Sequence, residues 1–204
     1  MPTNYAFTAA ERAVFRPLTS PVKIQRFLDA IAYDTGADGD RCRSPRLVLR
    51  EGLAMCMDGA LVGAAALRMI GCQPLLLDLE ADRDSDHVLA LFQVEGLWGA
   101  VAKSNYSGLR FREPVYRTLR ELALSYFEHY YNPAGEKTLR RYSRPVNLRR
   151  FDSRGWMTAD QDVWYVPEYL LTIPHTPMIP KTVERRLTRM DPRTYAAGLV
   201  GHVK

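Results

Sequence analysis

Residues 54–71 are the stretch that most limits how this chain can fold. The run AMCMDGALVGAAALRMIG is rich in alanine and glycine, so a helix formed from it is thin and can lie close against a sheet. Gly71 stands where a glycine commonly ends a helix. Cys56 falls in the first turn of this predicted helix, and His87 opens a later apolar run. A cysteine at a helix start, with a histidine on a later strand, is typical of a thiolate nucleophile.

Three strands are predicted after this helix. Residues 72–81 form a nearly continuous apolar run, which indicates a buried strand. Residues 87–94 form the next strand, and the pair Glu95-Gly96 predicts a tight hairpin turn. Residues 97–105 then return as the third strand, so the core of the chain is expected to be an antiparallel sheet beside a helix.

The segments on either side of this core add helices and extended chain. Residues 21–34 and 115–131 have apolar side chains at helical spacing, which predicts two amphipathic helices. Residues 139–151 are predicted to form an edge strand, because Pro145 disfavours a central position. Residues 162–174 are predicted to be extended.

The length of 204 residues favours a single domain. We divide it into an N-terminal helical region (1–44), a core (45–110) and a helix with a C-terminal strand and helix extension (111–204). The 47% hydrophobic and 25% charged content is ordinary for a soluble globular protein. No long uncharged apolar stretch and no secretion signal is found, so we expect a cytoplasmic protein without a membrane partner.

The three cysteines, Cys42, Cys56 and Cys72, are spaced in a way that matches no zinc pattern. Free thiols are the simplest interpretation, with Cys42 and Cys72 as packing residues. The acidic turn at 82–86 lacks the glycine and the distal glutamate of a calcium loop. We therefore expect no metal and no cofactor.

The net charge of +5 comes mainly from arginine, concentrated at 140–154 and 185–193. A basic face can attract nucleic acid or acidic partners. No zinc finger, aromatic RNA-binding motif or helix-turn-helix pattern accompanies it. A solvated basic surface is the favoured interpretation, and a nucleic-acid-associated protein is kept as a third alternative.

The spacing of polar residues defines a candidate catalytic set. Free N–H groups in the first turn of a helix lower the pKa of a thiol such as Cys56 and can hold an oxyanion. A neutral imidazole at His87 can take the thiol proton. A turn at Glu95-Gly96 pairs position i with roughly 191 minus i, which puts Ser104 opposite His87 and Asn105 one residue beyond. Asn105 is the predicted residue that orients the imidazole, and Ser104 is the competitor.

Each of these residues also has a structural interpretation. A lone cysteine on an alanine-rich helix is often a core residue, a lone histidine at a strand start is often a satisfied surface residue, and Asn105 can cap a turn. The order of the elements favours chemistry: cysteine at a helix start, strand, histidine at a strand start, hairpin, polar residue.

At these residues the sequence resembles the transglutaminase-like superfamily, over about residues 45–110. In that superfamily the nucleophilic cysteine is followed by an acidic residue, alanine, Leu-Arg and glycine, then by a histidine that opens a strand and by a tryptophan. The matching positions are Cys56, Asp58, Ala60, Leu67, Arg68, Gly71, His87 and Trp98.

The resemblance implies an α+β papain-like fold, with the catalytic-cysteine helix packed on an antiparallel sheet and flanked by further helices. The sequence departs from the family at two places. The usual His-Ala-Trp is His87-Val88-Leu89, and the usual Asp-Pro-Thr is replaced by Lys103-Ser104-Asn105. No calcium-loop pattern is present, so the metal dependence of animal transglutaminases is not implied.

Together these features predict a thiol enzyme that acts on an amide or peptide bond of a protein or peptide substrate. Cys56 attacks the carbonyl, His87 takes the thiol proton and returns it to the leaving amine, and Asn105 orients His87. Release of the acyl group to water gives a protease or amidase, and release to an amine gives acyl transfer. The alternative is a non-catalytic binding or scaffold domain that retains the fold. The oligomeric state stays open.

Overall fold

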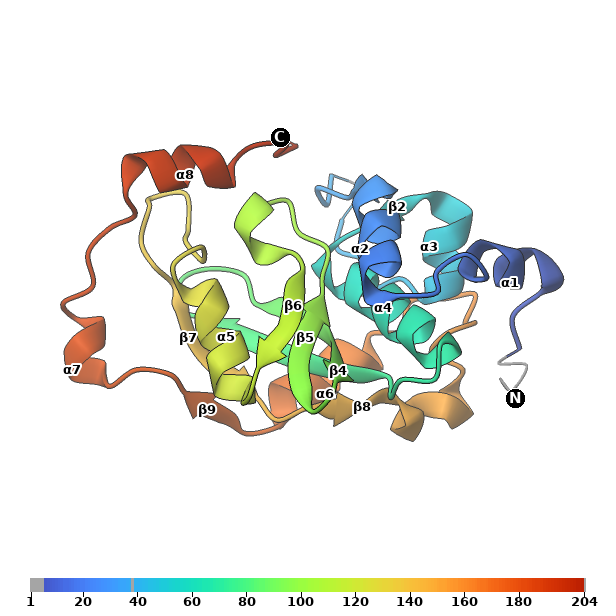
Figure 1. Cartoon of the computed structure of the whole chain (residues 1–204). Helices are drawn as coiled ribbons and strands as arrows, with labels where there is room; N and C mark the ends of the chain where they lie inside the picture. The colour runs from blue at the N-terminus through green and yellow to red at the C-terminus, as the bar shows by residue number, and fades with distance from the viewer. Residues whose placement is uncertain (1–5, 38, 204) are drawn as a thin grey trace.

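The computed structural model describes residues 6–37 and 39–203 and has a mixed α+β architecture (Figure 1). The strands of the main sheet are β3 (Leu75–Ala81), β4 (His87–Val94), β5 (Leu97–Val101), β6 (Arg112–Tyr116), β7 (Leu139–Ser143), β8 (Val146–Asn147) and β9 (His175–Pro177). Their order is β6-β5-β4-β3-β7-β9, with β8 also paired to β3, and every pairing is antiparallel. Two short strands, β1 (Ala32–Tyr33) and β2 (Leu53–Ala54), pair in parallel apart from this sheet.

Helices surround the sheet. They are α1 (Ala9–Phe15), α2 (Pro21–Ala30), α3 (Pro45–Glu51), α4 (Cys56–Met69), α5 (Leu119–Phe127), α6 (Tyr165–Thr172), α7 (Lys181–Glu184) and α8 (Pro192–Gly198), with 3-10 turns η1 (Ser107–Leu109) and η2 (Leu148–Arg154). Within the described ranges, none of these helices has the length and apolar character that crossing a bilayer requires.

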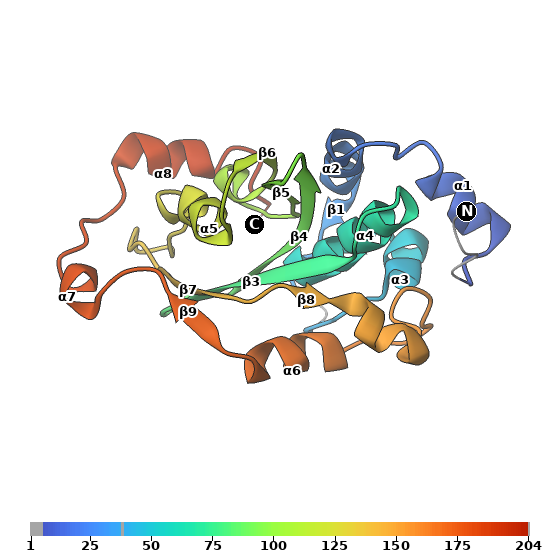
Figure 2. The same ribbon diagram turned by 60° about the horizontal axis from the view of Figure 1, so that its bottom comes forward.

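The sheet separates two hydrophobic cores because side chains alternate along each strand. Leu77 and Leu79 of β3 pack with α5 on one face. Leu76 and the β4 residues Val88 and Ala90 pack with α2, α4 and α6 on the other. Figure 2 shows α5 and α6 on opposite sides of the sheet.

Helix α4 lies directly against the strands, as its composition predicted. A Cβ added to Gly63 would lie 2.9 Å from Val101 Cγ2 and 3.2 Å from Ala90 Cβ. The glycine is therefore required by the close approach of helix and sheet.

The hairpin between β4 and β5 confirms the predicted register. Leu91 is opposite Ala100, and Glu95 and Gly96 form the turn with φ of 51° and 82°. Positive φ at both positions is the conformation of a type I′ turn, which matches the twist of the strands. The ladder ends at Val101, so the predicted third strand stops before residues 103–105.

Three predictions outside the core are corrected. Residues 162–174, predicted to be extended, contain helix α6, which buries Val166 and Leu170 at helical spacing. Pro167 is tolerated because it lies in the first helical turn, where an N–H group needs no helical partner. Strand β7 lies between β3 and β9 and is not an edge strand, since the chain breaks pairing before Pro145.

The helix predicted at 115–131 is also shorter in the structure. It begins at Leu119, where the Thr118 side chain accepts a hydrogen bond from the Glu121 N–H and caps the first turn. Residues 115 and 116 before this cap belong to strand β6.

Candidate active site

The start of α4 is fixed by Asp58, whose side chain is fully buried. Its Oδ2 accepts a hydrogen bond from the Met55 N–H at 3.1 Å, and its Oδ1 accepts one from the Arg43 N–H at 2.7 Å. A carboxylate in the first turn satisfies N–H groups that have no helical partner. Asp58 therefore sets the backbone from which Cys56 projects.

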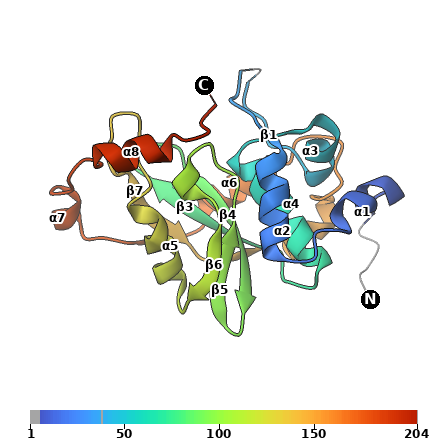
Figure 3. The same cartoon turned by 45° about the horizontal axis from the view of Figure 1, so that its top comes forward.

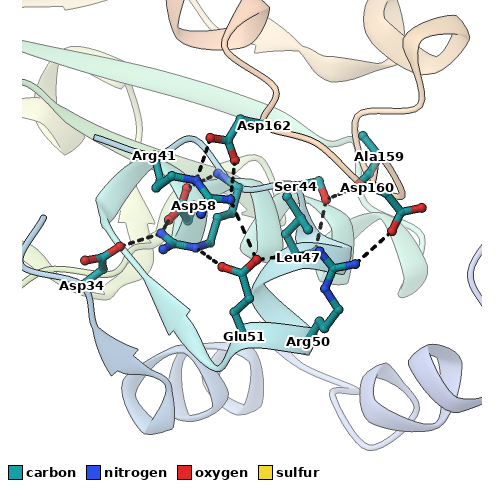
Figure 4. Close-up of polar contacts among 11 residues, drawn as sticks. Asp34, Arg41, Ser44, Leu47, Arg50, Glu51, Asp58, Ala159, Asp160 and Asp162 are labelled. Carbon is teal, nitrogen blue, oxygen red and sulfur yellow. Dashed lines mark hydrogen bonds and ion pairs between the residues drawn. The ribbon is translucent and has the colours of Figure 1, made fainter. Parts of the chain in front are cut away.

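An ionic cluster that includes Arg41 and Arg43 surrounds Asp58 (Figure 4). The buried guanidinium of Arg43 contacts Asp34 at 2.6 Å, Glu51 at 2.6 Å and Asp58 at 3.3 Å. Arg41 forms a bidentate pair with Asp162, at 2.7 and 3.0 Å. Because the partners come from separate parts of the chain, the cluster ties the beginning of α4 to α3 and to the segment before α6.

The thiol of Cys56 is partly buried at the N-terminus of α4 and lies 3.9 Å from the carbonyl oxygen of Asp86. Burial and the nearby Asp58 carboxylate raise the thiol pKa to about 11, and the N–H groups of Met57 and Val88 beside the sulfur act in the opposite direction. This corrects the expectation of a lowered pKa. Loss of hydration outweighs the helix N-terminus, so the thiol is protonated at neutral pH.

His87 is buried at the start of β4, with 4% of its surface exposed. Its Nε2 lies 2.8 Å from the carbonyl oxygen of Leu109. A carbonyl only accepts, so Nε2 carries the proton and Nδ1 of the neutral ring keeps its lone pair. Burial lowers the imidazole pKa to about 4, and the rings of Tyr126 and Tyr130 lie edge-on with centroids at 6.5 Å. His87 is thus a neutral base with a fixed tautomer.

Cys56 and His87 line the same cavity, which has a volume of about 440 Å³. Residues 84–86 form one wall of it, and this wall is held in place by Tyr130, whose hydroxyl donates to the Ser85 carbonyl at 2.6 Å. Tyr106 and Tyr131 also line the cavity. The structure therefore brings a thiol and an imidazole to one space large enough for a small acyl group or a side chain.

Asn105 is not placed against His87. Its Nδ2 donates to the Val203 carbonyl at 2.8 Å, and its Oδ1 accepts from the Val203 N–H at 2.8 Å. Ser104 does line the cavity, but its hydroxyl accepts a hydrogen bond from the Tyr106 N–H at 3.0 Å. The group that holds the imidazole is the main-chain carbonyl of Leu109. No residue type marks a carbonyl acceptor, so nothing in the sequence indicates it.

A second buried pair, Asp78 and His175, was also missed from the sequence. Asp78 Oδ2 lies 2.9 Å from His175 Nε2, and His175 Nδ1 lies 2.9 Å from the Ile173 carbonyl. Asp78 is opposite Val88 in the sheet, on the face that carries α4, and its charge also raises the Cys56 pKa. The available signal was a carboxylate that interrupts the apolar run LLLDLEA. The pair joins β3 to β9.

Two further features bear on cofactors and partners. Within residues 6–37 and 39–203, no group of three or more His, Cys, Asp or Glu side chains is arranged to hold a metal ion.

In the arginine-rich stretch, Arg150 stacks over the Tyr169 ring at 3.7 Å and Arg154 over the Tyr165 ring at 3.6 Å. Part of the basic surface is therefore packed against α6.

The geometry brings the Cys56 thiol, at the start of helix α4, and the His87 imidazole, at the start of strand β4, to one cavity. Comparison with protein-family models and with curated proteins gives no match to this chain. The functional argument rests on the site itself.

Proposed function

We propose that the chain is a transglutaminase-like thiol enzyme with a papain-like core, acting on an amide or peptide bond through a covalent cysteine-acyl intermediate. The observation that carries the proposal is the shared cavity of Cys56 and His87. The helix that begins at Cys56 packs on an antiparallel sheet, and the histidine opens a strand of that sheet. The other side of the imidazole is held by Leu109, so its free Nδ1 is the proton acceptor.

In the first step, Cys56 Sγ forms a bond to the carbonyl carbon while its proton passes to His87 Nδ1. The carbonyl π electrons move to oxygen. The N–H groups of Met57 and Val88, which face the sulfur, lie where they can stabilise negative charge. When the tetrahedral species collapses, the C–N bond breaks and the imidazolium returns the proton to the leaving amine. Water or a second amine then attacks the thioester.

The pKa values determine how the nucleophile is activated. The thiol is protonated and the imidazole is neutral at pH 7, so the proton transfer accompanies attack and no thiolate–imidazolium pair is preformed. This is the general-base mode of a serine hydrolase applied to a thiol. Removing the base should therefore lower the acylation rate by roughly 10²–10⁴-fold.

Acylation of the thiol tests the proposal directly. The protein is incubated with p-nitrophenyl acetate, and the acetylated residue is identified by peptide mass mapping. Acetylation is expected at Cys56, and it should slow in His87→Gln, whose amide N–H keeps the bond to Leu109 but supplies no base. Cys42, with 1% of its surface exposed, and the half-buried Cys72 are internal controls.

The second candidate function is a non-catalytic binding domain that uses the same cavity. The raised pKa of Cys56 favours it, because a protonated thiol is a weak nucleophile without an effective base. Acetylation of Cys56 no faster than that of Cys72, and unchanged in His87→Gln, would select the binding domain over the enzyme.

A further inference from the structure

The C-terminal segment, residues 195–203, lies beside the Cys56 cavity. Figures 1 and 3 show the chain after α8 running from the α5 side of the molecule toward α2 and β1. Gly201 and Val203 line a cavity of about 250 Å³ together with Asn105. This cavity and the Cys56 cavity have Tyr33 and Ser104 in common, so the two spaces adjoin.

The body of the protein holds this segment through its main chain. Asn105 bonds both the N–H and the C=O of Val203, at 2.8 Å each. The Ser107 hydroxyl donates to the Ala197 carbonyl at 2.8 Å, and the Tyr131 hydroxyl donates to the Tyr195 carbonyl at 3.0 Å. The Asn105 bonds involve only main-chain atoms of the segment, whereas the Tyr131 contact also needs glycine at position 198, where a Cβ would overlap the Tyr131 hydroxyl oxygen.

The Asn105 amide reproduces the edge of a β-strand. In an antiparallel sheet, a hydrogen-bonded residue pair exchanges one N–H···O bond in each direction, and the buried carboxamide makes the same two bonds to one residue. The Val203 side chain is 47% exposed and is not recognised. One residue earlier, the His202 ring meets Tyr106 edge-on with centroids 5.1 Å apart. Tyr106 also lines the Cys56 cavity.

We propose that Asn105 and Tyr106 form a binding site for an extended peptide main chain, and that residues 202 and 203, which follow the turn after α8, occupy this site intramolecularly. The ligand class is a polypeptide main chain with a flat ring one residue before the residue held by Asn105. The inference rests on the proposed function, because a bound peptide is a substrate only if Cys56 is acylated. It gives Asn105 a role in holding peptide rather than in orienting His87.

The test uses the full chain in a Cys56→Ala background, which keeps thiol chemistry out of the measurement. Val203→Pro removes the N–H that Asn105 accepts, and it should release the segment because proline has no amide proton. Val203→Ala keeps that N–H and is the matched control. Hydrogen exchange of the amides of residues 199–202 should be faster in Val203→Pro and in Asn105→Asp, and unchanged in Val203→Ala.

Binding is then measured by fluorescence anisotropy with a labelled peptide amide of residues 195–204. The Val203→Pro protein should bind it, and the Val203→Ala protein should bind it about tenfold or more weakly, because the tethered segment competes at high effective concentration. Adding Asn105→Asp to Val203→Pro should weaken binding by about tenfold, the usual effect of losing a hydrogen bond of about 1.4 kcal/mol. A peptide with proline in place of valine should not bind.

Peptide binding that is unchanged by Asn105→Asp would overturn the inference. So would the absence of binding by Val203→Pro when hydrogen exchange shows that its segment is released. The result of the peptide-binding test is independent of the result of the acetylation test of the proposed function. A protein that binds peptide but is not acetylated at Cys56 keeps the binding site and loses the enzyme, and a protein that is acetylated but binds no peptide does the reverse.

Discussion

His87 is expected to make the fold sensitive to acid. Burial moves its pKa from the ordinary value of 6.5 to about 4. Because the folded protein binds this proton less readily than the unfolded chain, the stability due to the neutral ring is complete above pH 6.5 and is lost as the pH falls toward 4. The full shift corresponds to about 3 kcal/mol, of which about 2 kcal/mol is lost by about pH 5.

The perturbation is His87→Gln. The glutamine amide can donate to the Leu109 carbonyl as the imidazole does, but it does not titrate. Urea unfolding is measured for wild type and variant at about pH 7.5 and about pH 5, and the wild type should lose about 2 kcal/mol more than the variant between them. Other titrating groups, such as Asp78, are present in both proteins and cancel in the comparison. His129→Gln is the comparison: burial also lowers the pKa of this imidazole, but the residue is exposed, so the variant should lose less of the wild-type pH dependence than His87→Gln.

An equal loss of stability in wild type and His87→Gln would refute the reasoning. A direct NMR titration of the His87 ring is the independent check, and a pKa near 6.5 would show that the ring is hydrated in solution. In that case the imidazole would still be mostly neutral at pH 7 and would be a stronger base, so the general-base step would stand while the predicted acid sensitivity would fail.

Two further predictions concern the N-terminus of α4. Asp58→Asn should lower the free energy of unfolding by roughly 1–3 kcal/mol in urea titrations, because its amide nitrogen then faces a buried N–H of Met55 or Arg43; Asp160→Asn, with a 68% exposed side chain, should be near neutral. The rate of Cys56 alkylation by iodoacetamide should keep rising to about pH 10, because the thiolate fraction grows tenfold with each pH unit below the pKa; a plateau near pH 8 would contradict the raised pKa.

The central fold could be predicted because its signals are local. The alanine- and glycine-rich run predicted a thin helix, and the Glu95-Gly96 pair predicted a hairpin. The predicted hairpin register agrees with the observed pairing of Leu91 with Ala100. The region after residue 139 was less predictable. Prolines there were interpreted as strand and loop signals, whereas Pro167 lies in the first turn of a helix. The decision between helix and extended chain came from burial of Val166 and Leu170 against distant residues.

The candidate site was predictable only in part. The order of Cys56 and His87 indicated that they would meet, and they line one cavity. The pKa of Cys56 was not predictable, because the helix N-terminus is visible in the sequence but the burial and the position of Asp58 are not. Extrapolating the hairpin register to Asn105 failed because the ladder ends at Val101, after which the chain turns away and meets residue 203.

The use of the Leu109 carbonyl has a consequence for how this site tolerates genetic change. A carboxamide or carboxylate partner can be lost by a single substitution, whereas a backbone oxygen is present whatever residue occupies position 109. Saturation mutagenesis scored on acylation should therefore show strict requirements at Cys56 and His87, with other apolar side chains accepted at the buried Leu109 as long as η1 keeps its course. The sequence around such a site can therefore change until it holds no recognisable Asp or Asn partner for the histidine. The orientation of the imidazole would be unaffected by that change.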